Sequence, residues 1–221
     1  MKRKVFYYII GILFLLILAY KLFFYLDAIE EKRLVQKNAA IKRLSSSQLN
    51  QIKEGDIILR RGYGFFSDMI AERLNQKPFD VTHSGIIVKE NGKWFVIHSL
   101  SSDVSNIDGV QKQALDDFLM HSQPNRLLIT RFKSNSYKTN DEIAGLAKYH
   151  QNKGVPFDLI GNYEDSSSMY CTEFILHILD QDLKLFKIPN ENAGREKFLK
   201  TMKGMYDTNY FKIIVNTYHS N

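Results

Sequence analysis

The sequence of 221 residues contains a single cysteine, four prolines and twelve glycines. One cysteine excludes an intrachain disulfide framework and every cysteine-rich zinc or iron–sulfur site. The small share of proline and glycine, with 44% apolar and 24% charged residues, excludes collagen-like, low-complexity and wholly disordered chains. About 190 residues remain beyond an apolar amino-terminal segment, a length that suits one globular domain with its own core.

The formal net charge of +6 does not indicate a nucleic-acid partner. Basic residues are scattered along the chain, and their only dense clusters, at residues 2–4 and 32–43, flank the apolar segment. Lysines and arginines at the two ends of a membrane-spanning helix and on a solvated surface account for this distribution. No nucleic-acid binding is therefore expected.

Residues 5–26 form an apolar run broken only by Lys21. A helix needs about 20 such residues to cross the hydrocarbon core of a membrane, and a lysine near one end can reach the interface. A cleaved signal peptide is the alternative, but residues 18–21 (Leu-Ala-Tyr-Lys) make a poor cleavage site. We predict a retained membrane anchor at residues 1–27. The basic residues 2–4 favour a cytoplasmic amino terminus and a domain outside the cytoplasm.

Beyond the anchor, the sequence predicts a polar helical stalk at residues 28–53 and one domain at residues 54–221. Strands are predicted at 56–60, 84–89, 93–98, 126–132 and 211–215, and helices at 66–74, 110–120, 139–152, 170–179 and 193–202. The pair Asn91-Gly92 is typical of a tight hairpin turn. The predicted fold class is α+β, with a central, mostly antiparallel sheet flanked by helices.

The single cysteine, Cys171, opens the apolar face of the helix predicted at 170–179. The positive end of a helix dipole lowers the pKa of a thiol, and the free amides there can hold an oxyanion. We expect the serines at 166–168 to cap these amides. An unpaired thiol outside the cytoplasm is a liability unless it has a use or is deeply buried. An inert cysteine packed beside Phe174 is the alternative.

Two of the six histidines fall on the predicted hairpin. His83 precedes one strand and His98 ends the other, so both should lie close together at its open end and on one face. Gly85 would leave room there for another group to approach. The remaining histidines show no comparable geometry and are predicted to be exposed or ordinary packing residues; they are His121, His150, His177 and His219.

A thiolate, a histidine base and a polar group that orients the base form a nucleophilic triad. Cys171, His83 and His98 supply these three kinds of group. A two-histidine metal site is an alternative, but it lacks a third ligand at matching spacing. Cross-strand packing of the two rings is another. No metal ion or cofactor is expected.

Several segments resemble those of NlpC/p60 papain-like cysteine hydrolases. These are residues 55–58 (Gly-Asp-Ile-Ile), 82–88 (Thr-His-Ser-Gly-Ile-Ile-Val) and 96–99 (Val-Ile-His-Ser). In the common form of that family the cysteine segment comes first. Here residues 170–175 (Tyr-Cys-Thr-Glu-Phe-Ile) come last, after 154–158 (Gly-Val-Pro-Phe-Asp). This order resembles the circularly permuted, YiiX-like branch of amidases, and the resemblance covers more than half of the chain.

The resemblance implies a permuted papain-like fold and a role for each matched residue. It implies Cys171 as the nucleophile, His83 as the general base and acid, and His98 as the orienting third residue. Many permuted members carry a glutamate at the third position, so the histidine here matches the non-permuted form. We interpret Glu173 as a structural charge of the first helical turn that points away from the thiolate, and Asp158 as a turn residue.

The function implied is that of a membrane-anchored cysteine hydrolase, an amidase or peptidase that cleaves an amide bond through an acyl-enzyme. Its expected partners are a small peptide or acyl-amide substrate, such as a cell-wall peptide or an acylated amine, and the membrane. An acyltransferase or lipid-modifying enzyme of the same fold, or a non-catalytic binding domain, are the alternatives. The sequence does not indicate an oligomeric state.

Overall fold

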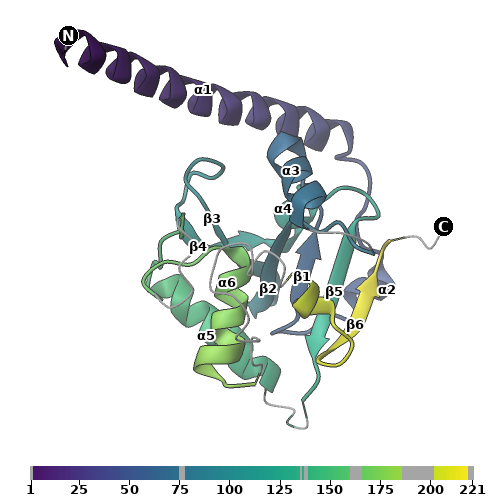
Figure 1. Ribbon diagram of the computed structural model, residues 1–221. Helices are drawn as coiled ribbons and strands as arrows, with labels where there is room; N and C mark the ends of the chain where they lie inside the picture. Colours follow the sequence, from purple (N-terminus) through teal and green to yellow (C-terminus); the bar gives the residue numbers. More distant parts are fainter. Residues whose placement is uncertain are drawn as a thin grey trace.

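A long amino-terminal helix leads away from a single sheet that carries helices on both faces (Figure 1). The computed structural model describes residues 2–74, 78–134, 136, 139–159, 166–185 and 202–218. The helix predicted at 193–202 lies almost wholly outside these described residues. The elements confirm the α+β class.

The sheet has six strands, and every neighbouring pair is antiparallel. Their order in space is β4-β3-β2-β1-β5-β6. The strands are β1 (Ile57–Arg60), β2 (His83–Glu90), β3 (Lys93–Leu100), β4 (Gly109–Ala114), β5 (Leu127–Phe132) and β6 (Phe211–Asn216). Strand β2 is central and pairs with β1 on one side and β3 on the other, so its backbone is fixed on both edges.

The β2–β3 hairpin confirms the predicted turn. Asn91 and Gly92 have φ angles of 50° and 78°, which a tight two-residue turn requires at both positions and which asparagine and glycine tolerate best. The turn sets a register in which Ile86 lies opposite Ile97. This register fixes which residues of the two strands are neighbours at the open end of the hairpin.

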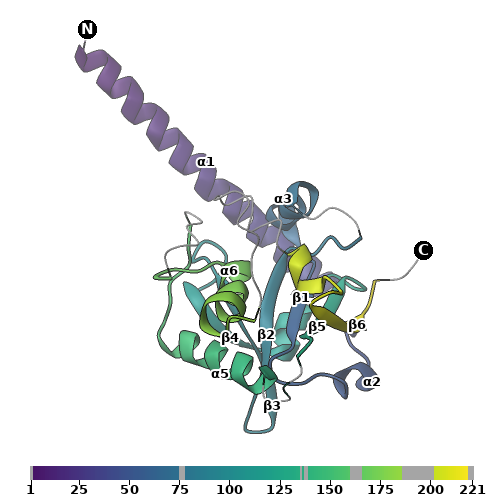
Figure 2. The same cartoon turned by 60° about the horizontal axis from the view of Figure 1, so that its bottom comes forward.

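Alternation along β2 divides the core between the two faces of the sheet. Ile86 and Val88 belong to one cluster, and Ile87 belongs to the other. On the first face lie helices α5 (Thr139–Asn152) and α6 (Cys171–Leu176), both in contact with β2 and β3 (Figure 2). The second face is covered by the short helices α2 (Ser46–Leu49) and α4 (Leu115–Met120), with Phe118 fully buried.

The helix predicted at 110–120 is wrong in its first half. Gly109–Ala114 forms the edge strand β4, which pairs with β3, and only Leu115–Met120 is helical. Pairing with β3 satisfies the backbone groups of this segment, so a tertiary contact outweighs a local pattern that fits either element. A smaller error concerns helix α3, which spans Gly64–Leu74 and therefore begins two residues before the predicted start at Phe66.

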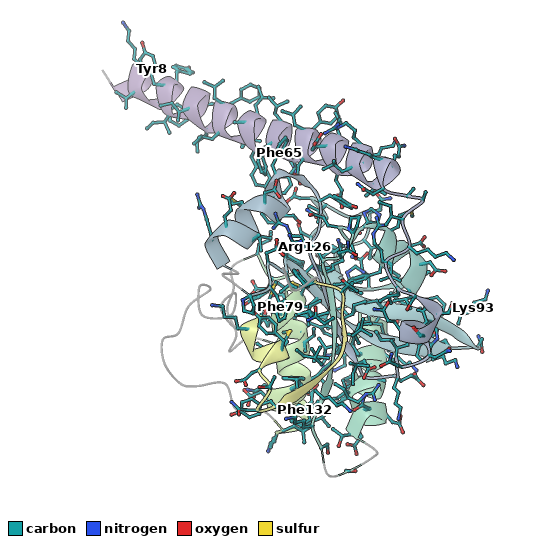
Figure 3. The ribbon with its side chains drawn as sticks, turned by 90° about the vertical axis from the view of Figure 1, so that its right-hand side faces the viewer. Tyr8, Phe65, Phe79, Lys93, Arg126 and Phe132 are labelled. Atoms are coloured by element: carbon teal, nitrogen blue, oxygen red, sulfur yellow. The ribbon has the colours of Figure 1, made fainter. Side chains whose placement is uncertain are left out.

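Helix α1 spans Lys2–Lys37 as one continuous helix, and from Lys4 onward it is long and apolar enough to cross a membrane. Most of its large apolar side chains along residues 5–26 are exposed, whereas Phe24 is half-buried and packs on Phe66 of α3. In Figure 3, Tyr8 lies near the free end of α1, whereas Phe65 of α3 lies beside the half nearer the domain. The helix predicted at 28–53 is shorter than expected, because α1 ends at Lys37 and only α2 follows.

The carboxyl-terminal half of α1 is bound to the domain through polar contacts. Asp27 is buried, and its Oδ1 accepts a hydrogen bond of 3.0 Å from the backbone N–H of Phe66, in the first turn of α3. Glu31 contacts His121 at 3.1 Å, and Lys21 forms an ion pair of 3.0 Å with Asp103. The end of α1 is therefore docked on the domain.

We predict that Asp27→Ala weakens the contact between α1 and the domain. The variant leaves the first amides of α3 without their carboxylate partner, which should cost about 1 kcal/mol, as the loss of a helix cap does. The melting temperature of the full chain in detergent should fall by about 2–4 °C. Glu30→Ala is the matched control, because among the described residues Glu30 pairs with Arg33 of the same helix and not with the domain. Equal melting temperatures for the two variants would show that the contact of Asp27 with α3 does not stabilise the protein.

Candidate active site

His83 and His98 form a hydrogen-bonded pair at the open end of the hairpin. Nε2 of His83 lies 2.9 Å from Nδ1 of His98, and the two rings meet edge to face. Both side chains are buried against the ring of Phe118, whose centroid is 5.8 Å and 5.4 Å from theirs. The predicted proximity of the two histidines is confirmed.

Gly85 is the residue that lets this pair form. A Cβ atom at position 85 would collide with the side chain of Val96 and would lie 3.1 Å from Cβ of His98. The space that the sequence predicted at Gly85 is therefore filled by the partner strand, not by a ligand. A glycine at this position allows the two strands to approach closely enough for the imidazoles to meet.

Arg60 is a third member of this cluster, and the sequence analysis missed it. It ends β1 directly opposite His83, is only 7% exposed, and its guanidinium lies 4.9 Å from the ring centroid of Phe118. It also donates a hydrogen bond to the carbonyl of His121. Burial lowers the pKa of Arg60 to about 10, so it remains charged at neutral pH. The signal in the sequence that could have predicted Arg60 is a charged residue directly after three aliphatic residues of a buried strand.

The surroundings keep both histidines neutral. Burial, with the positive charge of Arg60 second, lowers the pKa of His83 well below its usual value. The same two causes lower the pKa of His98 to about 3, with Gln113 acting in the opposite direction. A neutral imidazole carries one N–H and one free lone pair. If Nε2–H of His83 donates to Nδ1 of His98, Nδ1 of His83 is left as an acceptor.

Cys171 is the first residue of α6, as predicted, but the helix is capped differently from the prediction. The residue that precedes the helix is Tyr170, and its backbone N–H donates to Oε2 of Glu173 at 3.1 Å. The serines at 166–168 do not occupy the cap position. Glu173 is 1% exposed and holds the backbone at the start of the helix. This contact agrees with a structural role for its charge.

The predicted lowering of the Cys171 pKa is wrong in sign. Burial raises the pKa of the Cys171 thiol, and this effect outweighs the backbone and side-chain groups of Ser84 and the amide of Thr172, which act in the opposite direction. Desolvation disfavours the charged thiolate more than the helix end favours it. The resting cysteine is therefore a neutral thiol that remains partly accessible to solvent.

The thiol and the histidine pair lie on opposite faces of the sheet at β2, because successive side chains of a strand point to opposite faces. His83 packs with Phe118 on the α4 face, and Ser84 points towards α6. Cys171 contacts Ser84, the residue next to His83, from the α6 side of the sheet. Between these two described residues, Cys171 and His83, the structure contains no hydrogen bond from the sulfur to the imidazole. In the free protein the imidazole of His83 therefore does not contact the sulfur, and a catalytic contact between them would have to form when substrate binds.

Two of the other histidines, His150 and His177, differ from the prediction. His150 is buried and hydrogen-bonded to Asp182, and its ring lies 5.3 Å from that of His177, so these two do show a paired geometry. His121 contacts Glu31 of α1. His219 lies outside the described residues.

Asp158, which the sequence predicted as a turn residue, is buried, at 3% exposed.

Strands β2 and β3 of the antiparallel sheet carry one histidine each, and α6, which packs against both strands, begins with Cys171, an arrangement that fits the papain-like class of proteins. Within that class the cysteine segment here follows the histidine strands in the chain, which is the permuted order. Residues 51–212 match the family described as permuted papain-like amidase enzyme, YaeF/YiiX, C92 family. The chain belongs to this family, which confirms the resemblance identified in the sequence.

One solved structure supports the fold. The chain is similar to the crystal structure of metalloprotein YiiX from Escherichia coli O157:H7, with a TM-score of 0.50 and 19% sequence identity. The likeness covers 74% of this chain and 89% of that one. At this identity it shows a shared fold. A comparison with curated proteins finds no significant match.

We predict that Gly85→Ala separates the two histidines. The added methyl group would push β2 away from Val96 and His98, at a cost of about 1–3 kcal/mol in the free energy of unfolding. Urea unfolding measures this cost. Gly145→Ala is the control, because a Cβ there meets no described atom within 4 Å. A Gly85→Ala protein as stable as the control would contradict the close strand contact.

The buried, neutral histidines predict a loss of stability in acid. Their pKa values lie below 6.5 in the folded chain, so the unfolded chain binds more protons as the pH falls below about 6.5. The stabilisation is fully present above that pH and is lost towards pH 3, by at most about 1.4 kcal/mol per pH unit for each histidine. Urea unfolding at pH values between 7 and 4 measures this loss. The free energy of unfolding should fall less steeply with decreasing pH for His98→Gln than for the natural chain. An equal pH dependence of stability in the two proteins would contradict a buried, neutral His98.

Proposed function

We propose that the protein is a membrane-anchored cysteine amidase in which Cys171 is the nucleophile, His83 the general base and acid, and His98 the residue that orients His83. The observation that carries this proposal is the buried hydrogen bond of 2.9 Å between His83 and His98, one residue away from the Ser84 backbone that contacts the thiol. Membership in the permuted papain-like amidases agrees with it.

The proposed tautomer of the two imidazoles sets the direction of proton transfer. With Nε2–H of His83 donating to His98, the free lone pair on Nδ1 of His83 accepts the thiol proton of Cys171. The sulfur then attacks the carbonyl carbon of the amide, and backbone amides at the start of α6 stabilise the oxyanion. The protonated His83 gives its proton to the leaving amine as the C–N bond breaks. Water, activated by His83, then hydrolyses the thioester.

Arg60 contributes electrostatics to this mechanism. Its positive charge disfavours protonation of the two histidines, so His83 is unprotonated at rest but is also a weaker base. The charges of Arg60 and of a Cys171 thiolate attract each other, so Arg60 also favours the thiolate once it forms. In the resting state both thiol and imidazole are neutral, and the proton moves during the reaction. This differs from a thiolate–imidazolium pair formed in advance.

Helix α1 and its contacts with the domain determine where the enzyme encounters its substrate. One apolar helix is long enough to span a membrane, and its end is docked on α3 through Asp27. We infer that α1 anchors the enzyme, with the domain outside the cytoplasm as residues 2–4 favour. Amide substrates near the membrane surface, such as cell-wall peptides or acylated amines, fit this placement.

A second candidate function is acyl transfer to an amine, or modification of a lipid. The observation in its favour is the exposure of Phe65 and Met69 on α3, at 50% and 37%, beside the anchor helix. Apolar side chains beside a membrane helix hold the domain near acyl chains. The acyl-enzyme is common to both candidates. Product analysis with and without an added amine distinguishes hydrolysis from transfer.

We predict that Cys171→Ala abolishes turnover and leaves the fold intact. Hydrolysis of peptidoglycan peptides and of N-acyl amines by the full chain in detergent should fall by about 10³-fold or more, with an unchanged melting temperature. Ser47→Ala, a change at an exposed position, is the control. A variant that hydrolyses these amides at the natural rate, or that melts on substitution, would support an inert packing cysteine instead.

The state of the thiol can be tested on the same protein. Because burial raises the pKa of Cys171, its alkylation by iodoacetamide should accelerate steadily as the pH increases from 6 to 9. Peptide mapping locates the alkylated residue. A rate that is already constant near pH 6 would indicate a preformed thiolate and would contradict the neutral resting pair.

A further inference from the structure

A second cluster of ligand-type side chains lies at the end of α6 remote from Cys171. It consists of His150, His177 and Asp182, and one ligand atom of each lies within 4.8 Å of the other two. Nε2 of His150 is 2.7 Å from Oδ2 of Asp182, and Nε2 of His177 is 3.6 Å from Oδ1. A single carboxylate therefore faces two imidazoles.

A π-helix brings two of these residues together. After α6, the chain continues as the π-helical segment His177–Asp182, whose first and last residues are two members of the cluster. Side chains five apart in an α-helix differ in direction by about 140°. In a π-helix the hydrogen bonds run from i to i+5, as in the 3.0 Å bond from Leu183 N–H to the carbonyl of Ile178. Residues five apart, such as His177 and Asp182, therefore lie one above the other on adjacent turns. π-Helical turns are rare and occur frequently at functional sites.

The third member comes from a different element. His150 lies in the last turn of α5, which packs against the π-helical segment. Its ring stands almost perpendicular to that of His177, at 85°, and edge-on to the ring of Phe174. Its side chain is 8% exposed, that of His177 13% and that of Asp182 25%. The cluster is thus largely enclosed, with the carboxylate on the solvent side.

The distances and the donors fit a small divalent cation. In a tetrahedral zinc site with bonds of about 2.0–2.1 Å, two ligand atoms lie about 3.3 Å apart. The separations are to different oxygens of Asp182, 2.7 Å from His150 to Oδ2 and 3.6 Å from His177 to Oδ1, and they lie on either side of this value. Two neutral imidazoles and one carboxylate are also the donor types that zinc prefers, and a water molecule from the solvent side can complete four-coordination.

We propose that His150, His177 and Asp182 form a binding site for a divalent transition-metal ion, with zinc as the preferred ion. The site is separate from the candidate active site, because His177 follows Cys171 by six positions, about 9 Å along the helix axis. Its role is structural. The metal ties the carboxyl-terminal end of α5 to the helix that begins with Cys171, and so holds that helix against the sheet.

The test uses the full chain in detergent with Cys171→Ser as the background, so that zinc cannot bind the thiol. Metal is removed with a chelator and zinc is titrated back by calorimetry. We expect one equivalent to bind and the melting temperature to rise by several degrees in excess zinc. Cobalt added in place of zinc should give the visible absorption bands of a tetrahedral site.

Variants identify the ligands. His177→Gln and Asp182→Asn change the two more accessible members, and each should abolish stoichiometric binding and the thermal shift while leaving the chelated protein folded. His121→Gln is the matched control, because His121 faces the single carboxylate of Glu31 at 3.1 Å and should retain full binding. Binding that survives in both ligand variants, or no binding in the background protein, would overturn the proposal. Neither result bears on Cys171, which is absent from every protein in this test.

Discussion

The register of the β2–β3 hairpin is the constraint on which the candidate site depends. The turn at Asn91 and Gly92 sets the pairing, and the pairing places His83 and His98 at the open end on one face of the sheet. Because β2 also pairs with β1, Arg60 is held opposite His83. A slip of this pairing by one residue would place the two histidines on opposite faces of the sheet and break their contact. Local turn chemistry thereby controls the composition of a buried polar cluster.

Burial then sets the chemistry of that cluster. The histidines and the cysteine are all neutral in the resting protein, since desolvation opposes charge on each of them. The one charge that persists is the guanidinium of Arg60, which contacts Phe118 and the carbonyl of His121. This arrangement is suited to proton transfer that is coupled to attack on a substrate. The permuted order of the chain does not alter it, because strands and helix meet in space independently of where the sequence begins.

Much of the fold could be predicted from local signals, and the errors share a cause. The strands around Asn91-Gly92 and the helix that begins with Cys171 have strong local patterns, and the histidine pair follows from their register. The strand Gly109–Ala114 was predicted as helix because its partner β3 is not visible in the local pattern. Arg60 was missed, and the sign of the Cys171 pKa was wrong, because both depend on how tightly other segments enclose them. The π-helical turn that aligns His177 with Asp182 likewise has no periodic signal in the sequence.

The central claim is that an acyl group passes through Cys171 with His83 as the base. The most direct measurement mixes the full chain with an activated acyl ester, quenches the reaction in acid within milliseconds to seconds, and maps the modified peptide by mass spectrometry. The account predicts a thioester on Cys171 that forms and decays, and that accumulates far more slowly in His83→Ala. Turnover of the ester with no acyl group on Cys171, or equal acylation in the His83→Ala protein, would contradict it.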